Sequence, residues 1–397
     1  MSEKRRDSKN RILRTGESQR TDGRYAFKYT DTFGKPQFIY AWKLVETDKT
    51  PTGKRDDISL REKEKELQKD FDDGIDTVGK KMTVCQLYAK VIRHRGNVRP
   101  NTKNGRKRLM NILEQDRLGS CSIDSVKMSD AKEWAMRMKE KGVSYSTINN
   151  DKRSLKAAFY TAIQDDCIRK NPFDFQLNTV LDDDTEPKVP LTPEQEAELL
   201  SFVQSDNVYQ QYYDEIIILL GTGVRISELC GLTEADLDFE GRTINVDHQL
   251  LVATDIGYYI ETPKTKSGIR QIPMSESVYQ ACKRVVQNRN GAKPITIDGY
   301  SNFLFLKRDG YPKVVSNYGG MFRGLVKKYN KCHEGALPNS TTAHTMRHTF
   351  CTNLANAGMN PKALQYLMGH SNITMTLNYY AHATFASAKT EMLRLAA

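Results

Sequence analysis

One stretch without regular periodicity divides the chain and limits what it can fold into. Residues 171–190, NPFDFQLNTVLDDDTEPKVP, combine acidic residues and prolines with no sustained helical or strand period, which is typical of a linker. We place the linker at 176–190. Directly after it, Thr192 can cap a helix, with proline at the first helical position and Gln195 three residues after the cap. Because 397 residues suffice for two or three domains, separately folded parts are expected on either side.

The positive charge of the chain is concentrated before this linker. The formal net charge is +11, and residues 1–50 and 82–175 each carry a clear excess of Lys and Arg, whereas the remainder is slightly acidic. A basic excess confined to particular segments indicates surfaces that bind a polyanion, of which nucleic acid is the common one. Solubility alone is the alternative explanation.

Several classes of protein are disfavoured by simple features. No run of about 18 apolar residues is present, so no membrane span is expected. The start, MSEKRRDSKNRILR, is charged and lacks the apolar segment of a secretory signal. The seven cysteines are odd in number and form no C-x-x-C pair, which predicts reduced thiols in a cytoplasmic protein.

Residues 1–75 are predicted to form a small α+β domain. Residues 24–30 and 37–44 alternate aromatic and polar side chains around a Gly/Pro turn, which predicts a hairpin, and residues 11–16 are a candidate third strand. A helix is expected over 58–74. Aromatic residues interleaved with Lys and Arg fit a nucleic-acid-binding face, but they also fit the buried side that a three-stranded sheet requires.

Residues 82–175 are predicted to form an all-α domain of four or five helices. The helix within 82–94 can be capped by a Thr at its start, and a second helix is expected to begin at Ser129 and end at Gly142. A long amphipathic helix follows from residue 144. A basic helical bundle fits a module that binds duplex phosphates, with an ordinary solvated helix face as the alternative.

Residues 191–397 mix helices with short strands and contain five polar features that suggest chemistry. GTGVRISEL places Arg225 before a helix, where it can bind a phosphodiester or simply pair with Glu228. TPKTKSGIRQIPM places Lys266 at a predicted hairpin turn. The other candidates are His344 and Arg347 in HTMRH, His370 in LMGH, and Tyr379 and Tyr380 in NYYAH.

The HTMRH segment also raises the possibility of a metal site, because His344 and His348 are four residues apart on a predicted helix. A zinc protease requires H-E-x-x-H, but position 345 is Thr, so the general base is absent. Arg347 would also place a cation beside the metal. We therefore expect no metal and no cofactor, and His348 is expected to support the site through hydrogen bonds.

The order of these motifs resembles that of the tyrosine recombinase family, the phage-type integrases, over about residues 190–385. The matching features are an Arg followed by Ser-Glu, a hairpin Lys, H-x-x-R-H, an [LM]-G-H, and a Tyr nine residues after that His. The resemblance implies a mainly α catalytic domain with a small β-sheet (191–397), preceded by a core DNA-binding domain (82–175). The whole chain is most similar to integrases of conjugative transposons, and its first domain resembles their arm-binding domain.

The resemblance implies a role for each candidate residue. Tyr379 would attack a DNA phosphodiester and form a 3′-phosphotyrosyl link, while Arg225, Arg347 and His370 stabilise the transition state. Lys266 would protonate the leaving 5′-oxygen, and His344 would act in acid–base chemistry or donate to the phosphate. Strand exchange through a four-way junction would then integrate or excise a mobile element, with no metal and no ATP.

The resemblance also implies partners and leaves alternatives open. The expected DNA partner is double-stranded DNA at core and arm sites. The chain is expected to be monomeric or dimeric when free and to form a synaptic homotetramer on DNA. An excisionase and DNA-bending proteins are further expected partners, and the expected place of action is the nucleoid in the cytoplasm. A C-terminal helix over 383–397 would dock on a neighbouring protomer or on its own domain. Tyr380 competes with Tyr379, and Lys264 with Lys266. A sequence-specific DNA-binding regulator and a type IB topoisomerase-like enzyme are the alternative functions.

Overall fold

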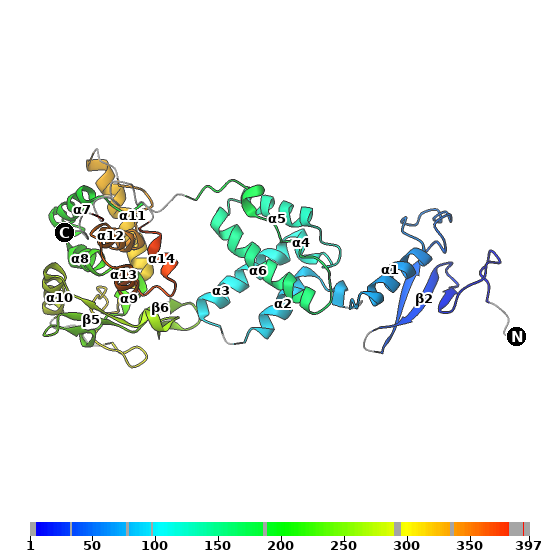
Figure 1. Ribbon diagram of the computed structural model, residues 1–397, viewed down its shortest axis with the longest axis horizontal. Helices are drawn as coiled ribbons and strands as arrows, with labels where there is room; N and C mark the ends of the chain where they lie inside the picture. Colours follow the sequence, from blue (N-terminus) through cyan, green and yellow to red (C-terminus); the bar gives the residue numbers. More distant parts are fainter. Residues whose placement is uncertain are drawn as a thin grey trace. The chain divides into compact units, whose positions relative to one another are not determined.

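The computed structural model describes residues 5–380 except 32–33, 77–78, 97, 186–188, 290–294 and 334–336, and it also describes Met392. The chain forms two compact units, residues 1–185 and 186–397, drawn in Figure 1. The division falls inside the segment predicted as a linker, whereas the domain limits given above remain a prediction. The expected C-terminal helix lies outside the described residues apart from Met392. Among the described residues, no helix is long and apolar enough to cross a membrane.

The first unit begins with a three-stranded antiparallel sheet in the order β1-β2-β3 and one helix. The elements are β1 (Glu17–Gln19), β2 (Tyr25–Thr30), β3 (Pro36–Ala41) and α1 (Leu60–Asp72). Ser59 caps α1 in a capping box with Glu62. The prediction of a third strand over 11–16 is wrong: the strand is 17–19, which pairs with residues 25–27.

The second part of this unit is all helical. It contains α2 (Val84–His94), α3 (Pro100–Gln115), α4 (Arg117–Ser120), α5 (Met128–Glu140) and α6 (Tyr145–Gln164). The predicted Thr cap of α2 is confirmed, because the Thr83 side chain accepts from the Gln86 N–H. The predicted start of α5 at Ser129 is wrong by one residue, since the Lys127 N–H donates to Asp130 at 2.8 Å and the helix begins at Met128. One buried cluster, which includes the fully buried Trp134 and Phe159, joins these helices.

The second unit is mainly helical with two small sheets. Its helices are α7 (Pro193–Ser205), α8 (Tyr213–Thr222), α9 (Ile226–Gly231), α10 (Glu276–Asn288), α11 (Val315–Cys332), α12 (Ala343–Asn356), α13 (Pro361–Met368) and α14 (Ile373–Leu377). Its strands are β4 (Leu237–Asp238), β5 (Thr243–Val246), β6 (Gln249–Ala253), β7 (Gly257–Glu261) and β8 (Arg270–Pro273). The predicted cap of α7 is confirmed, with Thr192 and Gln195 forming a capping box.

The strands of the second unit pair differently from the prediction. β4, β5 and β8 form one sheet and β6 and β7 form another. Because β7 and β8 lie in separate sheets, the segment 262–269 that carries Lys266 is a connection between sheets rather than a hairpin turn. A short 3-10 helix, Lys266–Gly268, lies within it.

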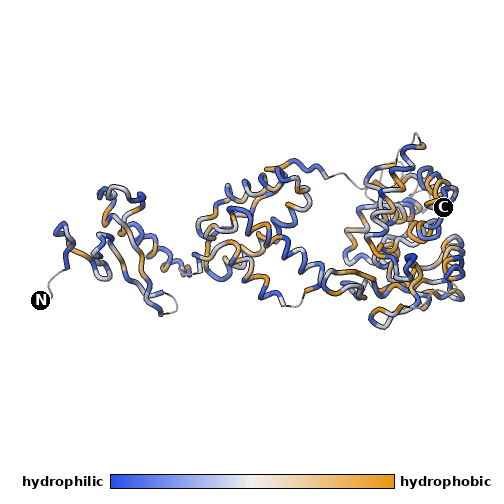
Figure 2. The backbone as a smooth tube through the Cα atoms, turned by 180° about the vertical axis from the view of Figure 1, so that it is seen from behind, coloured by the Kyte–Doolittle hydropathy of each residue, from blue (hydrophilic) through white to orange (hydrophobic). Residues whose placement is uncertain are grey.

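Alternating hydrophobic and hydrophilic positions along the helices explain how both units form cores. Figure 2 shows orange and blue segments alternating along most helices, the pattern of elements with one buried face. The exception is α8, whose sequence YDEIIILLGT is mostly buried, so it lies at the centre of the second unit and packs against α10 and α12. This packing fixes the end of α8 relative to α12, and both helices carry residues of the candidate site.

Candidate active site

The candidate residues lie on or beside five helices of the second unit, α8, α9, α12, α13 and α14. Helix α8 ends at Gly223, which adopts φ +62°, a conformation that glycine accepts without strain. Arg225 follows as the residue that caps α9. Arg347 lies on α12, and His370 follows Gly369, which ends α13 with φ +61°. The short helix α14 then leads to Tyr379.

Three successive backbone carbonyls at the C-terminal end of α13 each accept a hydrogen bond from a different arginine. The pairs are Leu367 with Arg270 Nε (2.6 Å), Met368 with Arg347, and Gly369 with Arg225 (3.1 Å). The last carbonyls of a helix have no partner within the helix and carry partial negative charge. The helix end therefore holds three cations together without neutralising them.

One carboxylate, Glu228, is placed among these arginines. Its side chain accepts from Arg225 Nη1 at 2.7 Å and from Arg270 Nη2 at 2.8 Å. Burial alone would raise the pKa of Glu228, but the hydrogen bonds and charge of Arg270 outweigh burial and lower it. Arg225 therefore does pair with Glu228, as one of the two predictions for it stated. It is also half-exposed and lines a cavity, so it can still bind a phosphodiester.

Arg270 was not predicted as part of the site, although its side chain is completely buried. In addition to Glu228 and Leu367 it donates to the Gly268 carbonyl at 2.9 Å. The signal available in the sequence was an arginine at a position that alternates with Gln271 and shares its face with the apolar Ile272, in the short strand segment IRQIPM. A buried arginine requires a carboxylate or several carbonyl partners, so this pattern could have been recognised.

Arg347 is buried and is bonded to two backbone carbonyls, those of Gly223 and Met368. Burial and the neighbouring charge of Arg225 lower its pKa to about 9. Arg347 therefore stays positively charged at pH 7, but its charge is poorly compensated. A phosphodiester anion bound beside it would supply the missing negative charge.

His370 is held as a neutral side chain. Burial, together with the charges of Arg347 and Arg225, lowers its pKa to about 4. Its Nδ1 lies 3.0 Å from the Thr376 hydroxyl, which can donate to it and so place the ring proton on Nε2. A neutral histidine in this tautomer can still donate one hydrogen bond to a phosphate oxygen.

The two neighbouring tyrosines have different surroundings. The hydroxyl of Tyr379 lies 2.9 Å from Nδ1 of His348. Burial raises the pKa of Tyr379 to about 12, and the charge of Arg347 acts in the opposite direction. The hydroxyl of Tyr380 instead donates to the Met359 carbonyl at 2.5 Å, which directs it away from the arginines.

Two cavities share His370 in their linings and bring most of the candidates together. The first has a volume of about 630 Å³ and is lined by His344, Arg347, His348, His370 and Tyr379, among others. The second, of about 360 Å³, is lined by Arg225, Glu228, Lys264 and His370, among others. Lys266 is exposed and lines neither cavity, whereas Lys264, the competing candidate, lines the second.

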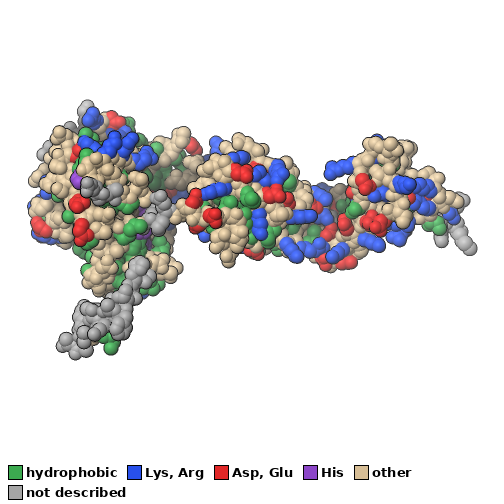
Figure 3. Space-filling view, turned by 90° about the horizontal axis from the view of Figure 1, so that it is seen from above, with side chains coloured by type: hydrophobic (Ala, Val, Ile, Leu, Met, Phe, Trp, Pro, Cys, Tyr) green, Lys and Arg blue, Asp and Glu red, His purple; other side chains and the backbone are tan. Residues whose placement is uncertain are grey.

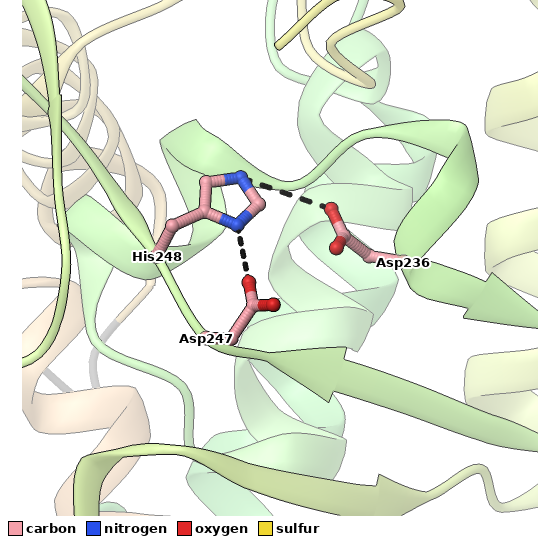
Figure 4. Close-up of side chains that lie close together, drawn as sticks. All are labelled: Asp236, Asp247 and His248. Atoms are coloured by element: carbon pink, nitrogen blue, oxygen red, sulfur yellow. Dashed lines mark hydrogen bonds and ion pairs between the residues drawn. The ribbon is translucent and has the colours of Figure 1, made fainter. Parts of the chain in front are cut away.

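A separate cluster in this unit, Asp236, Asp247 and His248, has the composition of a metal site. Figure 4 shows the imidazole between the two carboxylates, with Nδ1 at 2.6 Å from Asp247 and Nε2 at 3.8 Å from Asp236. Nε2 also lies 2.7 Å from the Gly231 carbonyl. Because a carbonyl can only accept, Nε2 carries a proton there and is not available to coordinate a metal.

The sheet of the first unit separates its aromatic residues by face. Ile39 packs in the core of this part, whereas Phe38 and Tyr40 on the same strand are exposed. The guanidinium groups of Arg20 and Arg24 lie 5.4 and 5.5 Å from the centre of the Tyr40 ring. Lys and Arg side chains are numerous on the visible face of the first unit in Figure 3. The expectation of core packing is therefore confirmed for Ile39, and the exposed Phe38 and Tyr40 leave the expectation of a nucleic-acid-binding face as a prediction.

Two sequence families match the chain. The phage integrase family matches residues 190–387, and the family described as the DNA binding domain of Tn916 integrase matches residues 1–71.

Among characterised relatives, the transposase from transposon Tn916 of Enterococcus faecalis is 69% identical over 395 residues, which cover 100% of this chain and 97% of that protein. The transposase from transposon Tn1545 of Streptococcus pneumoniae gives the same values. A solved structure, "Structure of the Tn1549 transposon Integrase (aa 82-397, Y379F) in complex with transposon right end DNA", is 77% identical with a TM-score of 0.76, covering 80% of this chain and 100% of that chain.

Proposed function

The chain belongs to the tyrosine recombinases of the phage integrase family, and on that premise we propose that it is a site-specific DNA integrase that inserts and excises a mobile element of the conjugative-transposon type. The relatives that match its full length are transposon proteins, and the solved relative is a complex with transposon-end DNA. The predictions of family, fold and enzyme class are confirmed by these matches.

The observation that supports the chemistry best is the set of arginines bonded to the end of α13, beside a cavity that Tyr379 lines. In the proposed reaction, the Tyr379 oxygen attacks a DNA phosphorus and forms a 3′-phosphotyrosyl link, while the 5′-oxygen leaves. Arg347 and Arg225 bind the non-bridging oxygens and stabilise the charge that develops on them. The His370 N–H donates a further hydrogen bond, and His344 assists at the rim of the cavity.

We assign the acid for the leaving 5′-oxygen to a lysine of the 262–269 connection. The sequence pattern favoured Lys266, but the cavity lining favours Lys264, which shares a cavity with Arg225 and His370. Since the phosphotyrosyl link conserves the energy of the broken phosphodiester, the reaction needs no ATP. Attack by the 5′-hydroxyl of a partner strand then exchanges strands, and two such rounds pass through a four-way junction.

The two parts of the first unit are assigned to DNA binding. Residues 1–71 match the DNA binding domain of Tn916 integrase, and the exposed pair Phe38 and Tyr40 with its neighbouring arginines is suited to arm sites. The helical bundle is assigned to core sites. Recombination of two duplexes requires four active chains, so we propose a synaptic homotetramer, with an excisionase and DNA-bending proteins as further partners. We propose that the protein acts on its DNA substrate in the cytoplasm, at the nucleoid.

Trapping of a covalent adduct tests the proposed function. The full chain is incubated with a nicked duplex that carries a transposon right end, so that the short cleaved strand diffuses away and the adduct accumulates. We expect an adduct with wild type and with Tyr380→Phe, and none with Tyr379→Phe. An adduct with Tyr379→Phe would overturn the assignment of the nucleophile. Relaxation of supercoiled plasmid without exchange between paired sites would favour a type IB topoisomerase instead.

A further inference from the structure

The hydroxyl of Tyr379 is bonded to a histidine that the proposed mechanism does not use. His348 follows Arg347 on α12, and its Nδ1 lies 2.9 Å from the Tyr379 oxygen. The centres of the two rings are 5.3 Å apart. The inference that follows deepens the proposed function and rests on it, because it concerns the step in which Tyr379 attacks DNA.

A tyrosine in this environment needs a proton acceptor. With a pKa of about 12, only about one molecule in 10⁵ carries the phenolate at pH 7. The phenol must therefore lose its proton while it attacks, to a base within hydrogen-bonding distance. Because Tyr379 is half-buried and lines a cavity, this base comes from the protein or from a molecule within the cavity.

Three histidines line the same cavity, and their positions distinguish them. His370 has its Nδ1 against the Thr376 hydroxyl, and its low pKa makes it a poor base. His344 lies one helical turn before His348, with its ring nearly perpendicular to that of His348 at 4.5 Å. The Tyr379 hydroxyl is within hydrogen-bonding distance of His348, at 2.9 Å.

We propose that Nδ1 of His348 accepts the phenolic proton of Tyr379 during cleavage and returns it during rejoining. In cleavage, the phenol oxygen forms the bond to phosphorus and its proton moves to Nδ1. The bond from phosphorus to the 5′-oxygen breaks, and that oxygen keeps the electron pair and takes a proton from the lysine. In rejoining, the 5′-hydroxyl gives its proton to the lysine and attacks phosphorus, and the His348 imidazolium protonates the departing phenolate.

The surroundings of His348 are compatible with a transient positive charge. The charged or titratable groups that line its cavity are His344, Arg347, His370 and Tyr379. Arg347, which precedes His348 on α12, places a positive charge at the same cavity. The bound phosphodiester adds negative charge next to the ring and favours the imidazolium once Tyr379 attacks.

Single-turnover cleavage of the nicked duplex carrying the Tn1549 right end tests this role in the full chain. His348→Asn places an amide oxygen near the position of Nδ1, so the hydrogen bond is kept but the base is lost. We expect its cleavage rate to fall about 10²–10⁴-fold. His344→Asn is the same change one turn away on α12, and His333→Asn is the control at an exposed position outside both cavities, with an expected rate close to wild type.

Replacing the Tyr379 phenol by 2,3,5-trifluorotyrosine separates proton transfer from a structural role. This more acidic phenol loses its proton more readily, so it should recover most of the rate lost in His348→Asn but not the rate lost in His344→Asn. A rate for His348→Asn within about threefold of wild type, or a deficit that fluorination leaves unchanged, would overturn the inference while the proposed function stands. Absence of any adduct with the wild-type chain would overturn both.

Discussion

Replacing Glu228 by Gln removes the one carboxylate bonded to Arg225 and Arg270 while keeping the shape of the side chain. Glu228 is 3% exposed and the Arg270 side chain is 0% exposed. Removing one partner of a buried ion pair costs about 3–5 kcal/mol, because the other charge is left uncompensated. We therefore expect Glu228→Gln to lower the stability of the second unit by about this amount.

The loss can be measured as a shift in melting temperature. The second unit has 212 residues (397 − 186 + 1), and for a domain of this size 1 kcal/mol corresponds to about 2–4 °C. The expected decrease is therefore about 6–20 °C in differential scanning calorimetry of the full chain. Hydrogen exchange of peptides from α9 and β8 assigns the shifted transition to the second unit.

A matched control and a double variant make the result specific. Asp214→Asn is also a change from acid to amide beside an arginine, but its partner Arg284 is 46% exposed. Such surface pairs contribute about 0–1 kcal/mol, so its shift should stay below about 4 °C. Adding Arg270→Met to Glu228→Gln should recover part of the loss. A shift of less than about 2 °C for Glu228→Gln would refute the account of a buried carboxylate stabilising the arginines.

Three further predictions concern other parts of the molecule. Gly223→Ala should destabilise the second unit by about 1–3 kcal/mol, measured by calorimetry, because Gly223 has φ +62° and a Cβ there would lie 2.3 Å from the Phe350 ring. Lys264→Ala should slow cleavage of the nicked duplex about 10²–10⁴-fold, and more than Lys266→Ala does. A 5′-phosphorothiolate substrate, whose sulfur leaves without a proton, should restore the cleavage rate of Lys264→Ala if Lys264 is the acid. Burial and the charge of Glu17 raise the pKa of Glu64 to about 7, so the folded first unit holds this proton to higher pH than the unfolded chain. The stability of the first unit should therefore fall as pH rises from about 4.3 to about 7. Glu64→Gln should weaken this pH dependence in melting curves at pH 5 and pH 8.

Local features of the fold could be predicted from the sequence because they depend on neighbouring residues. The caps Thr83 and Thr192 are confirmed, since a capping box involves residues only three positions apart. The start at Ser129 was wrong because the Asp130 carboxylate accepts an N–H from Lys127 and extends the helix by one residue. The hairpin at Lys266 was wrong because β7 pairs with the strand before it, β6, and β8 pairs with the more distant strand β5.

The candidate site was predictable as a set of residues but not as an arrangement. The motifs identified Arg225, Arg347 and Tyr379, and the structure places them at two cavities that share His370. Their catalytic roles remain proposals. The pattern around Arg270 could have indicated a buried arginine, but its partner Leu367 is 97 positions away and could not be predicted. No local pattern indicates that a helix end far along the chain supplies the carbonyls for a buried arginine.

The three carbonyls of residues 367–369 also affect how the site tolerates mutation. Because the acceptors belong to the backbone, substitutions of Leu367 or Met368 change packing volume but cannot delete an acceptor. Gly369 differs, since a Cβ there would lie 3.1 Å from both Arg270 Nη1 and the Ser267 carbonyl and would require φ +61°. Substitutions along α13 can therefore change its side chains without changing the positions of the three arginines. Gly369 is the exception, because a side chain there would disturb this arrangement.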